Sequence, residues 1–222
     1  MDPSELLKGV LVAIPIGVWI LFGVGIALTV LRALYRAKIK GWLGEKEVSG
    51  TLRWKLDAEL YRVFDDLYLP RSDGKGTTQV DHVVVSKFGV FVIETKNFKG
   101  WIFGKEKDGQ WTKKIGRNSY RFQNPLRQNE LHVKALEKFL GLGRERFHSV
   151  VYFVGGSTFK TKVPENVIDR GLLKYVEGFR EELLAEADVR RSAEMLEKLD
   201  AELDRKRVGR EHVEALRGRM RR

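Results

Sequence analysis

The feature that most constrains this fold is a pair of apolar runs joined by a short turn. Residues 81–100 read DHVVVSKFGVFVIETKNFKG, with VVV and VFVI on either side of Ser-Lys-Phe-Gly. Apolar, β-branched runs bounded by a glycine-containing turn are typical of a buried β-hairpin. Each run carries an acid at its outer end, Asp81 before the first and Glu94 after the second, and Lys96 follows two residues later. The pattern therefore predicts charged groups at one end of two otherwise buried strands.

The length of the turn decides whether these two acids meet. A two-residue loop at 87–88, or a four-residue loop, places Asp81 directly opposite Glu94, whereas a three-residue loop ending in Gly89 places Asp81 opposite Thr95. Directly opposed residues have Cβ atoms about 5 Å apart, where like charges destabilise the pair. A hard divalent cation, Mg²⁺ or Mn²⁺, would offset that repulsion by binding the carboxylate oxygens.

Lys96 shares a strand face with Glu94, because side chains alternate with period two. In the first two registers one face thus presents two carboxylates and an ammonium, which suits metal-assisted phosphodiester hydrolysis. The ordinary interpretation of such residues is that they are solvated caps at strand ends. The hairpin alone leaves both interpretations open.

Two residues elsewhere in the chain favour a site. On a helix expected over residues 38–60, Glu45 lies on the apolar stripe, and charges are rarely buried unless they are paired or bind a metal. A second helix, expected to begin at Asn124-Pro125, places Gln128 and His132 toward the core side. Glu45 could instead lie at the edge of its stripe near solvent, and Gln128 could be a satisfied amide at the core edge.

The N-terminus is a separate feature. Gly9–Leu31 is a run of 23 residues without a charge. At about 1.5 Å per residue such a helix can cross a hydrocarbon core about 30 Å thick. The four basic residues and no acid in 32–40 predict, by the positive-inside rule, an N-terminus outside and a cytoplasmic body. The sequence therefore predicts an uncleaved, single-pass anchor in the cell membrane.

The charge of the chain indicates its partners. The formal net charge is +11, which favours polyanions such as nucleic acid or an anionic membrane face. The absence of cysteine excludes disulfides and thiolate metal sites. Basic residues interleave with aromatics after the hairpin, where we expect contacts with nucleic acid at Lys113, Lys114, Arg117 and Arg121. Trp101 and Trp111, in the same region, are expected to pack a hairpin turning at Asp108-Gly109 against the core.

The elements together predict an α/β fold, in which a mixed β-sheet is flanked by helices. We expect an N-terminal transmembrane helix in residues 1–35, the main domain in 36–160 and a C-terminal helical region in 161–222. The helices from residue 172 onward are a candidate surface for a protein partner.

Several spaced motifs resemble the nuclease-related domain called NERD. They are GEKEV at 44–48, TTQVDHVVVSKFGVFVIETKNFKGWIFG at 77–104, Trp111 and YRFQNPLRQNELH at 120–132. The resemblance, over roughly residues 41–155, implies a restriction-endonuclease-like core similar to that of PD-(D/E)xK nucleases. It implies a catalytic signature of Asp81, Glu94 and Lys96, supported by Glu45 and Gln128, with a metal held by Asp81, Glu94 and Glu45.

The leading functional hypothesis is therefore a membrane-anchored, Mg²⁺-dependent nuclease that acts on DNA or, less favoured, RNA. One alternative is a nucleic-acid-binding module that keeps the nuclease-like fold without cutting. Another is an interaction protein, in which residues 172–222 recruit a partner to the lipid bilayer.

Overall fold

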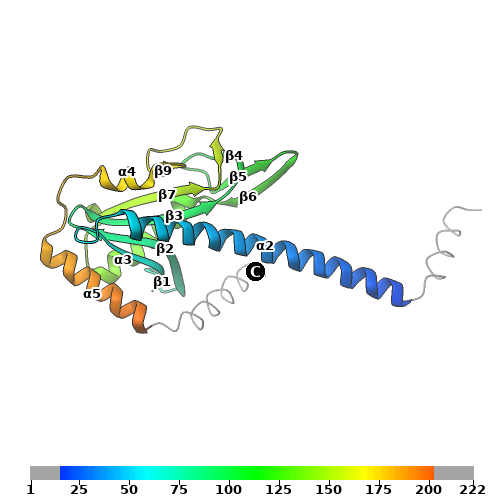
Figure 1. Cartoon of the computed structure of the whole chain (residues 1–222), viewed down its shortest axis with the longest axis horizontal. Coiled ribbons are helices and arrows are strands. Elements are labelled where there is room, and N and C mark those ends of the chain that lie inside the picture. The colour runs from blue at the N-terminus through cyan, green and yellow to red at the C-terminus, as the bar shows by residue number, and fades with distance from the viewer. Residues whose placement is uncertain (1–15, 203–222) are drawn as a thin grey trace, which may run out of the picture. The chain divides into compact units, whose positions relative to one another are not determined.

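The computed structural model describes residues 16–202 (Figure 1). The chain divides into two compact units, Met1–Leu43 and Gly44–Arg222. Helix α2, Ile16–Lys55, contributes residues to both units. The other elements described below all belong to the second unit.

A five-stranded mixed sheet forms the centre of the second unit, with strand order β1-β2-β3-β7-β9. The first three strands are antiparallel, and β7 and β9 add to β3 in parallel. The strands are β1 (Arg62–Pro70), β2 (Thr77–Ser86), β3 (Gly89–Asn97), β7 (Phe147–Val154) and β9 (Val167–Ile168). Most side chains of β2 and β3 between residues 82 and 95 are buried, as their apolar runs predict.

A second sheet of four strands has the order β6-β5-β4-β8. Its strands are β4 (Gly100–Phe103), β5 (Gln110–Ile115), β6 (Asn118–Gln123) and β8 (Ser157–Phe159). One face of this sheet packs Ile102 and Trp111 against Phe153 of β7 in a shared core. The two sheets are also linked directly along the chain, because β4 begins soon after β3 ends.

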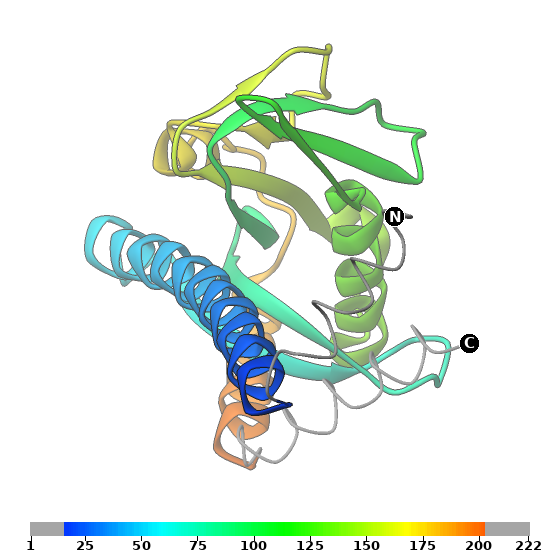
Figure 2. The same ribbon diagram turned by 90° about the vertical axis from the view of Figure 1, so that its right-hand side faces the viewer.

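Helices cover both faces of the five-stranded sheet (Figure 2). On one face lie α3 (Pro125–Leu140) and α5 (Glu186–Glu202), which share a core with inward-facing valines of β2 and β3. On the other face lie α4 (Leu172–Glu177) and the part of α2 from Val48 to Lys55. A short 3-10 helix, η1 (Arg144–Arg146), precedes β7. The predicted mixed α/β fold with flanking helices is thereby confirmed.

Three local predictions are wrong. Trp101 does not pack against the core as expected, because it is 48% exposed, whereas Trp111 is buried. The helix expected over residues 38–60 ends at Lys55, and Leu60 is exposed. The strands β4 and β5 do not turn at Asp108-Gly109, because β4 stops at Phe103 and residues 104–109 form a longer loop. The buried Trp111 ring lies so close to Gly104 that a Cβ there would approach it to 2.2 Å.

A two-residue turn does occur one hairpin later. It joins β5 to β6 through Gly116-Arg117, with Ile115 paired to Asn118 and a positive φ of 56° at Gly116. After residue 160 the chain forms α4 and α5, as expected of a helical region, but also the short strand β9. The basic tail beyond residue 202 lies outside the described residues.

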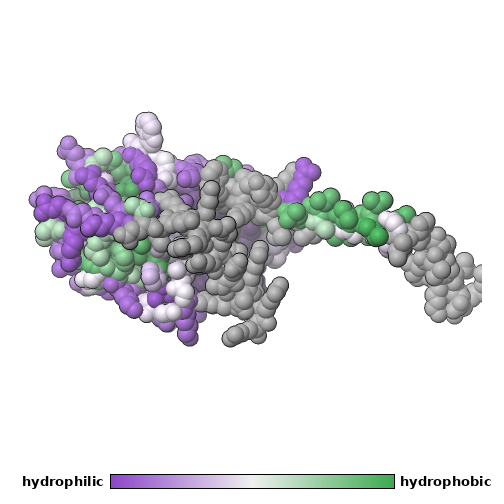
Figure 3. All heavy atoms as spheres, turned by 90° about the horizontal axis from the view of Figure 1, so that it is seen from below, coloured by the Kyte–Doolittle hydropathy of each residue, from purple (hydrophilic) through white to green (hydrophobic). Residues whose placement is uncertain are grey.

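The first unit bears on the predicted membrane anchor. Its described apolar side chains are exposed, and they form the mostly green surface of α2 in Figure 3. They include Val18, Trp19, Ile20, Leu21, Phe22, Val24, Ile26, Leu28 and Leu31. Among residues 16–202, no helix combines the length and apolar character needed to cross a membrane. The predicted span, Gly9–Leu31, begins outside the described residues.

Candidate active site

The register of the β2–β3 hairpin brings the two predicted acids together. Ser86 pairs with Gly89 across a two-residue turn, and the ladder continues in that register to His82 and Ile93. The Ser86–Gly89 pair excludes the three-residue loop, and one further step in the same register, just beyond the last ladder pair, would place Asp81 opposite Glu94. Gly89 has φ of 124°, and a Cβ there would lie 2.9 Å from the Arg146 carbonyl oxygen. Glycine is thus required at the turn that sets this register.

The neighbouring β1–β2 ladder is broken at the level of Asp81. Asp66, which would pair with Asp81, has a positive φ of 54° and makes no ladder pair, although the pairs on either side are formed. Left-handed backbone is uncommon outside glycine, and aspartate is among the residues that adopt it at least cost. Such conformations persist only where the surrounding structure holds them.

This break changes which side chains face the core. Before it, Phe64 of β1 and its partner Val83 of β2 face the α3–α5 core; beyond it, Leu67 and its partner Val80 do so. The alternation therefore shifts by one residue in both strands, while the register stays the same and neither strand gains an extra residue. On the other side of β2, the Asp81 carboxylate accepts the backbone N–H of Thr95 in β3 at 2.8 Å.

Glu94 is the centre of a hydrogen-bonded network. Its side chain is 1% exposed, and Lys96 Nζ donates to its Oε1. Lys96 Nζ also donates to Gln128 Oε1 at 3.0 Å. His132, one turn after Gln128 on α3, donates from Nε2 to Glu94 Oε2 at 3.0 Å, and its Nδ1 lies 2.8 Å from Thr78 Oγ1. Since an ionised carboxylate only accepts, both Glu94 oxygens have donors.

Burial and charge act in opposite directions on these carboxyl groups. Burial raises the pKa of Asp81 well above its ordinary value, and the nearby charges of Glu94 and Glu45 raise it further. Burial also acts to raise the pKa of Glu94, but the Lys96 ammonium and the His132 hydrogen bond outweigh it and lower that pKa. The Glu94 carboxylate in turn raises the pKa of Lys96 against the effect of burial. The site is thus an ion pair with a second, poorly compensated carboxyl group beside it.

Glu45 belongs to the same electrostatic cluster. It is half-buried on α2, and burial and the charge of Asp66 raise its pKa. Glu94 raises the pKa of Glu45 as well, while His82 and Lys96 lower it. Glu45 therefore interacts with acids of two strands, Asp66 and Glu94, and it acts in turn on Asp81 of a third.

A second polar network attaches α2 to the sheet next to Glu45. Asp65 Oδ2 accepts from Ser49 Oγ at 2.6 Å and from Arg53 Nε at 2.9 Å, and Asp65 Oδ1 lies 2.6 Å from His82 Nδ1. Although burial acts in the opposite direction, these hydrogen bonds lower the pKa of Asp65 to about 2. Ser49 lies one helical turn after Glu45, so the network fixes the helix turn that carries Glu45.

The structure thus brings Asp81, Glu94, Lys96, Glu45 and Gln128 into one cluster, as the sequence predicted. The residues predicted to bind nucleic acid lie elsewhere, on the second sheet: Lys113 and Lys114 on β5, Arg117 in the following turn and Arg121 on β6. Sequence reasoning missed Asp65, Asp66 and His82. Two adjacent acids inside the otherwise apolar strand RVFDDLYLP were the available signal.

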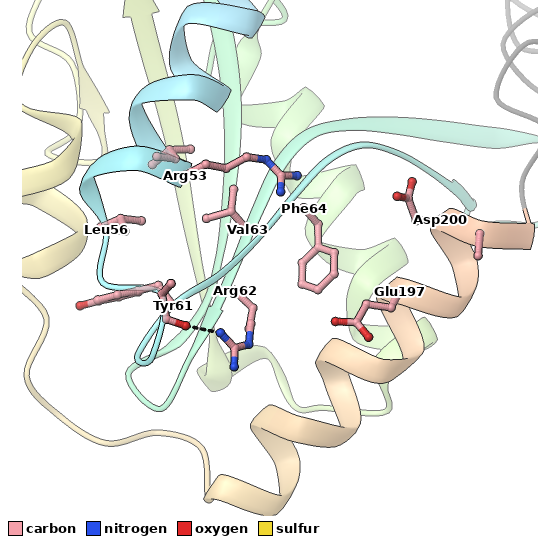
Figure 4. Close-up of a pocket in the computed structure, with 11 residues that line it drawn as sticks. Arg53, Leu56, Tyr61, Arg62, Val63, Phe64, Glu197 and Asp200 are labelled. Atoms are coloured by element: carbon pink, nitrogen blue, oxygen red, sulfur yellow. Dashed lines mark hydrogen bonds between the residues drawn. The ribbon is translucent and has the colours of Figure 1, made fainter.

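Two further observations bear on this cluster. Within 16–202, no group of three carboxylate, imidazole or thiol side chains is arranged to hold a metal ion, so Asp81, Glu94 and Glu45 do not form such a group. A cavity of about 480 Å³ lies between α2, β1 and α5, lined by Arg53, Tyr61, Phe64 and Glu197 among others (Figure 4). It shares Arg53 with the Asp65 network but contains none of the predicted site residues.

Comparison with known proteins identifies relatives. The model of the family described as "Nuclease-related domain" matches residues 40–154. An uncharacterized protein of Bacillus anthracis is 45% identical over 118 residues, which cover 53% of this chain and 55% of that protein. The aligned region therefore spans about half the length of that relative. No solved structure matches.

Proposed function

This chain belongs to the nuclease-related domain family, and on that premise we propose that it is a metal-dependent nuclease that hydrolyses phosphodiester bonds of DNA or RNA, with DNA favoured. The observation that carries the proposal is the convergence of two carboxylates, an ammonium and an amide at one end of the sheet. Lys96 contacts both Glu94 and Gln128, and Asp81 adjoins them across the hairpin. A buried ion pair beside a carboxyl group with a perturbed pKa is a common feature of catalytic sites.

The oxygen-rich chemistry of Asp81 and Glu94 supports Mg²⁺ or Mn²⁺ as the proposed metal. Mg²⁺ commonly keeps waters and substrate phosphate oxygens as ligands and needs only one or two protein carboxylates. Asp81 and Glu94 would hold it, whereas Glu45 would have to move to join them, because the three are not arranged as a ligand group. Burial and the charges of Glu94 and Glu45 raise the pKa of Asp81, and a bound cation would offset the repulsion. A bound divalent cation lowers the pKa of its water and stabilises negative charge on phosphate.

The other side chains of the site have separate roles in positioning groups and stabilising charge. The amide of Gln128 and the carboxylate of Glu94 hold the Lys96 ammonium in position, from where it can stabilise charge that develops on a phosphate oxygen. His132 holds the other oxygen of Glu94, so that the carboxylate keeps one orientation. Asp81 is anchored by the backbone of Thr95 and offers its remaining acceptor sites.

A cleavage assay with the full chain tests the proposal. Plasmid, linear duplex and single-stranded substrates are incubated with and without Mg²⁺, using wild type, Asp81→Asn and Lys96→Ala. Lys138→Ala, which alters an exposed lysine on α3, is the matched control. We expect the two site variants to lose roughly 100-fold or more in rate and the control to lose none. Equal cleavage by wild type and Asp81→Asn would refute the assignment.

The main alternative is a nucleic-acid-binding module that does not cut. It is favoured by one observation, namely that Lys96 and His132 already occupy both oxygens of Glu94. In a silent site, this arrangement would simply satisfy a buried carboxylate. Stabilisation by Mg²⁺ without any cleavage by the wild type would support this alternative.

We also propose that residues 9–31 attach the chain to a lipid bilayer, with a cytoplasmic body. The support is the uncharged run itself and the exposed apolar side chains of its described part. Residues 172–222 are proposed as a surface for a protein partner, because α5 has an exposed, charged outer side.

A further inference from the structure

The second sheet has a face that its core does not use. Ile102 and Trp111 point into the shared core, so their strand neighbours point to the opposite, outer face. Trp101 lies on that outer face directly opposite Lys114 of β5, and Arg121 lies on it opposite Thr112. We call Trp101, Lys114, Arg121 and Lys160 the outer platform.

The platform presents an exposed indole among cations. Trp101 is 48% exposed, an unusual position for so large an apolar ring. Lys160 Nζ lies 4.6 Å from the centroid of the Trp101 ring, so the ring carries a cation–π contact. Arg121 and Lys160 are exposed, and Lys114 is half-buried beside the ring.

The positive charge of the second sheet indicates which class of ligand it would bind. The four strands GWIF, QWTKKI, NSYRFQ and STF contain two lysines and one arginine but no acid. A face of this kind is complementary to a polyanion. A flat aromatic ring among phosphate-binding cations is the arrangement by which proteins bind unpaired bases, since every base can stack on the ring.

We propose that the outer platform binds single-stranded nucleic acid, with a base stacked on Trp101 and phosphates held by Lys114, Arg121 and Lys160. The choice of nucleic acid as the ligand rests on the proposed function. Position along the chain supports it, because β4 begins at Gly100, directly after the strand that carries Glu94 and Lys96 ends at Asn97. A single-stranded nucleic acid bound to the outer platform would therefore contact the segment of the chain that directly follows β3, the proposed catalytic strand.

The alternation of side chains gives a specific distinction between two adjacent lysines. Lys113 shares the core-facing side with Trp111, and its Nζ lies 4.2 Å from the Phe98 ring centroid. Lys114 lies on the outer face opposite Trp101. The proposal therefore assigns phosphate contact to Lys114 and none to Lys113, although both belong to the predicted basic cluster.

The test measures binding of the full chain to labelled oligonucleotides in chelator, where no metal-dependent cleavage occurs. Fluorescence anisotropy with a 20-nucleotide single strand and the matching duplex is recorded for wild type, Trp101→Ala and Trp54→Ala. Trp54 is an 88% exposed tryptophan on α2 and serves as the matched control. We expect Trp101→Ala to weaken single-strand binding roughly 5- to 100-fold, with a smaller loss on duplex, and Trp54→Ala to change neither.

The lysine pair provides the second measurement. Lys114→Gln should reduce the slope of log affinity against log salt by about 0.7 for single strands, whereas Lys113→Gln should leave it unchanged. Unchanged single-strand affinity in Trp101→Ala, or equal slopes for the two lysine variants, would overturn the proposal.

Vesicles containing phosphatidylserine distinguish a membrane surface from nucleic acid as the ligand of the platform. A loss in Trp101→Ala confined to the vesicles would overturn the proposal. Because binding is measured without turnover, this test is independent of cleavage. Single-strand binding by the outer platform can be confirmed even if the chain does not cleave, and it can be refuted even if the chain does.

Discussion

The substitution Asp65→Asn tests how the fold holds Glu45 at the site. In the wild type, the Asp65 carboxylate accepts hydrogen bonds from Ser49 and Arg53 of α2 and contacts the buried His82. A neutral amide keeps the size of the side chain but removes the charge that these donors compensate. We therefore predict a less stable fold and a loosened α2, in which Glu45 is no longer held toward the acid cluster.

The magnitude follows from the pKa of Asp65. Its hydrogen bonds lower the pKa from an ordinary value of 3.8 to about 2 in the fold. A lowering by roughly 1.8 pH units corresponds to about 2.4 kcal/mol, at about 1.36 kcal/mol per unit. Because the folded-state pKa is the lower one, this stability is present above pH 3.8 and is lost as the pH falls toward 2. At neutral pH the variant should melt roughly 5–10 °C lower, given about 2–4 °C per kcal/mol for a chain of this size.

Urea unfolding of wild type and Asp65→Asn between pH 7 and pH 2.5 provides the assay. The difference between the two proteins cancels the titration of the other acids. It should be about 2 kcal/mol at pH 7 and should shrink as the pH falls below about 4. A difference that stays constant over this range would refute the reasoning, since it would mean that the carboxylate charge is not what stabilises the network.

Asp73 provides a control for the effect of exposure. Hydrogen bonds from Arg71 and from the backbone of Lys75 lower the pKa of Asp73 to about 2 as well. Its side chain is 41% exposed, and solvent and salt screen such a pair. Asp73→Asn should therefore have a much smaller effect than Asp65→Asn, and added salt should remove it.

Four further outcomes are expected. Asp81→Asn should keep or raise the melting temperature in chelator at pH 7 and lose any Mg²⁺-dependent stabilisation, because burial and neighbouring acids raise the pKa of Asp81 and so disfavour its charged form. Lys96→Ala should keep much of the Mg²⁺ binding seen by calorimetry while losing turnover and stability, since it leaves Glu94 buried without its cation. Gln128→Leu should slow cleavage less than Lys96→Ala, because it removes only one of the two acceptors that hold the ammonium. A reporter fused after Arg222 should be active in the cytoplasm, and periplasmic or extracellular activity would contradict the proposed orientation.

The parts of the site that sequence predicted are those fixed by local rules. The β2–β3 register follows from a two-residue turn, which was one of the loop lengths that the sequence allowed, and it is the register that brings Asp81 toward Glu94. The start of α3 follows from Asn124-Pro125, and Asn124 Oδ1 accepts the N–H of Leu126 at 2.9 Å as an N-cap should. With that helix start known, Gln128 could be assigned to the correct face.

The parts that sequence missed depend on contacts between distant segments. Nothing local requires a left-handed backbone at Asp66, because only tertiary structure holds a non-glycine residue there. The break it causes shifts the alternation in β1, so a period-two interpretation assigns the residues beyond it to the wrong face. His82 contacts Asp65 because β1 pairs with β2 in this register. The two residues are far apart in the sequence, so no local pattern predicts the contact.

The two polar networks explain how the fold tolerates its acid cluster. On the side of α3, Lys96 and His132 compensate Glu94; on the side of α2, Arg53 and His82 compensate Asp65. Burial and the charges of Glu94 and Glu45 raise the pKa of Asp81 despite its hydrogen bond from the Thr95 backbone, while the pKa values of the two compensated acids fall. A fold selected for stability alone would place an apolar residue at that position, since an uncompensated buried carboxyl group lowers stability. Asp81 is thus the acid of this cluster whose charge a bound cation would compensate most.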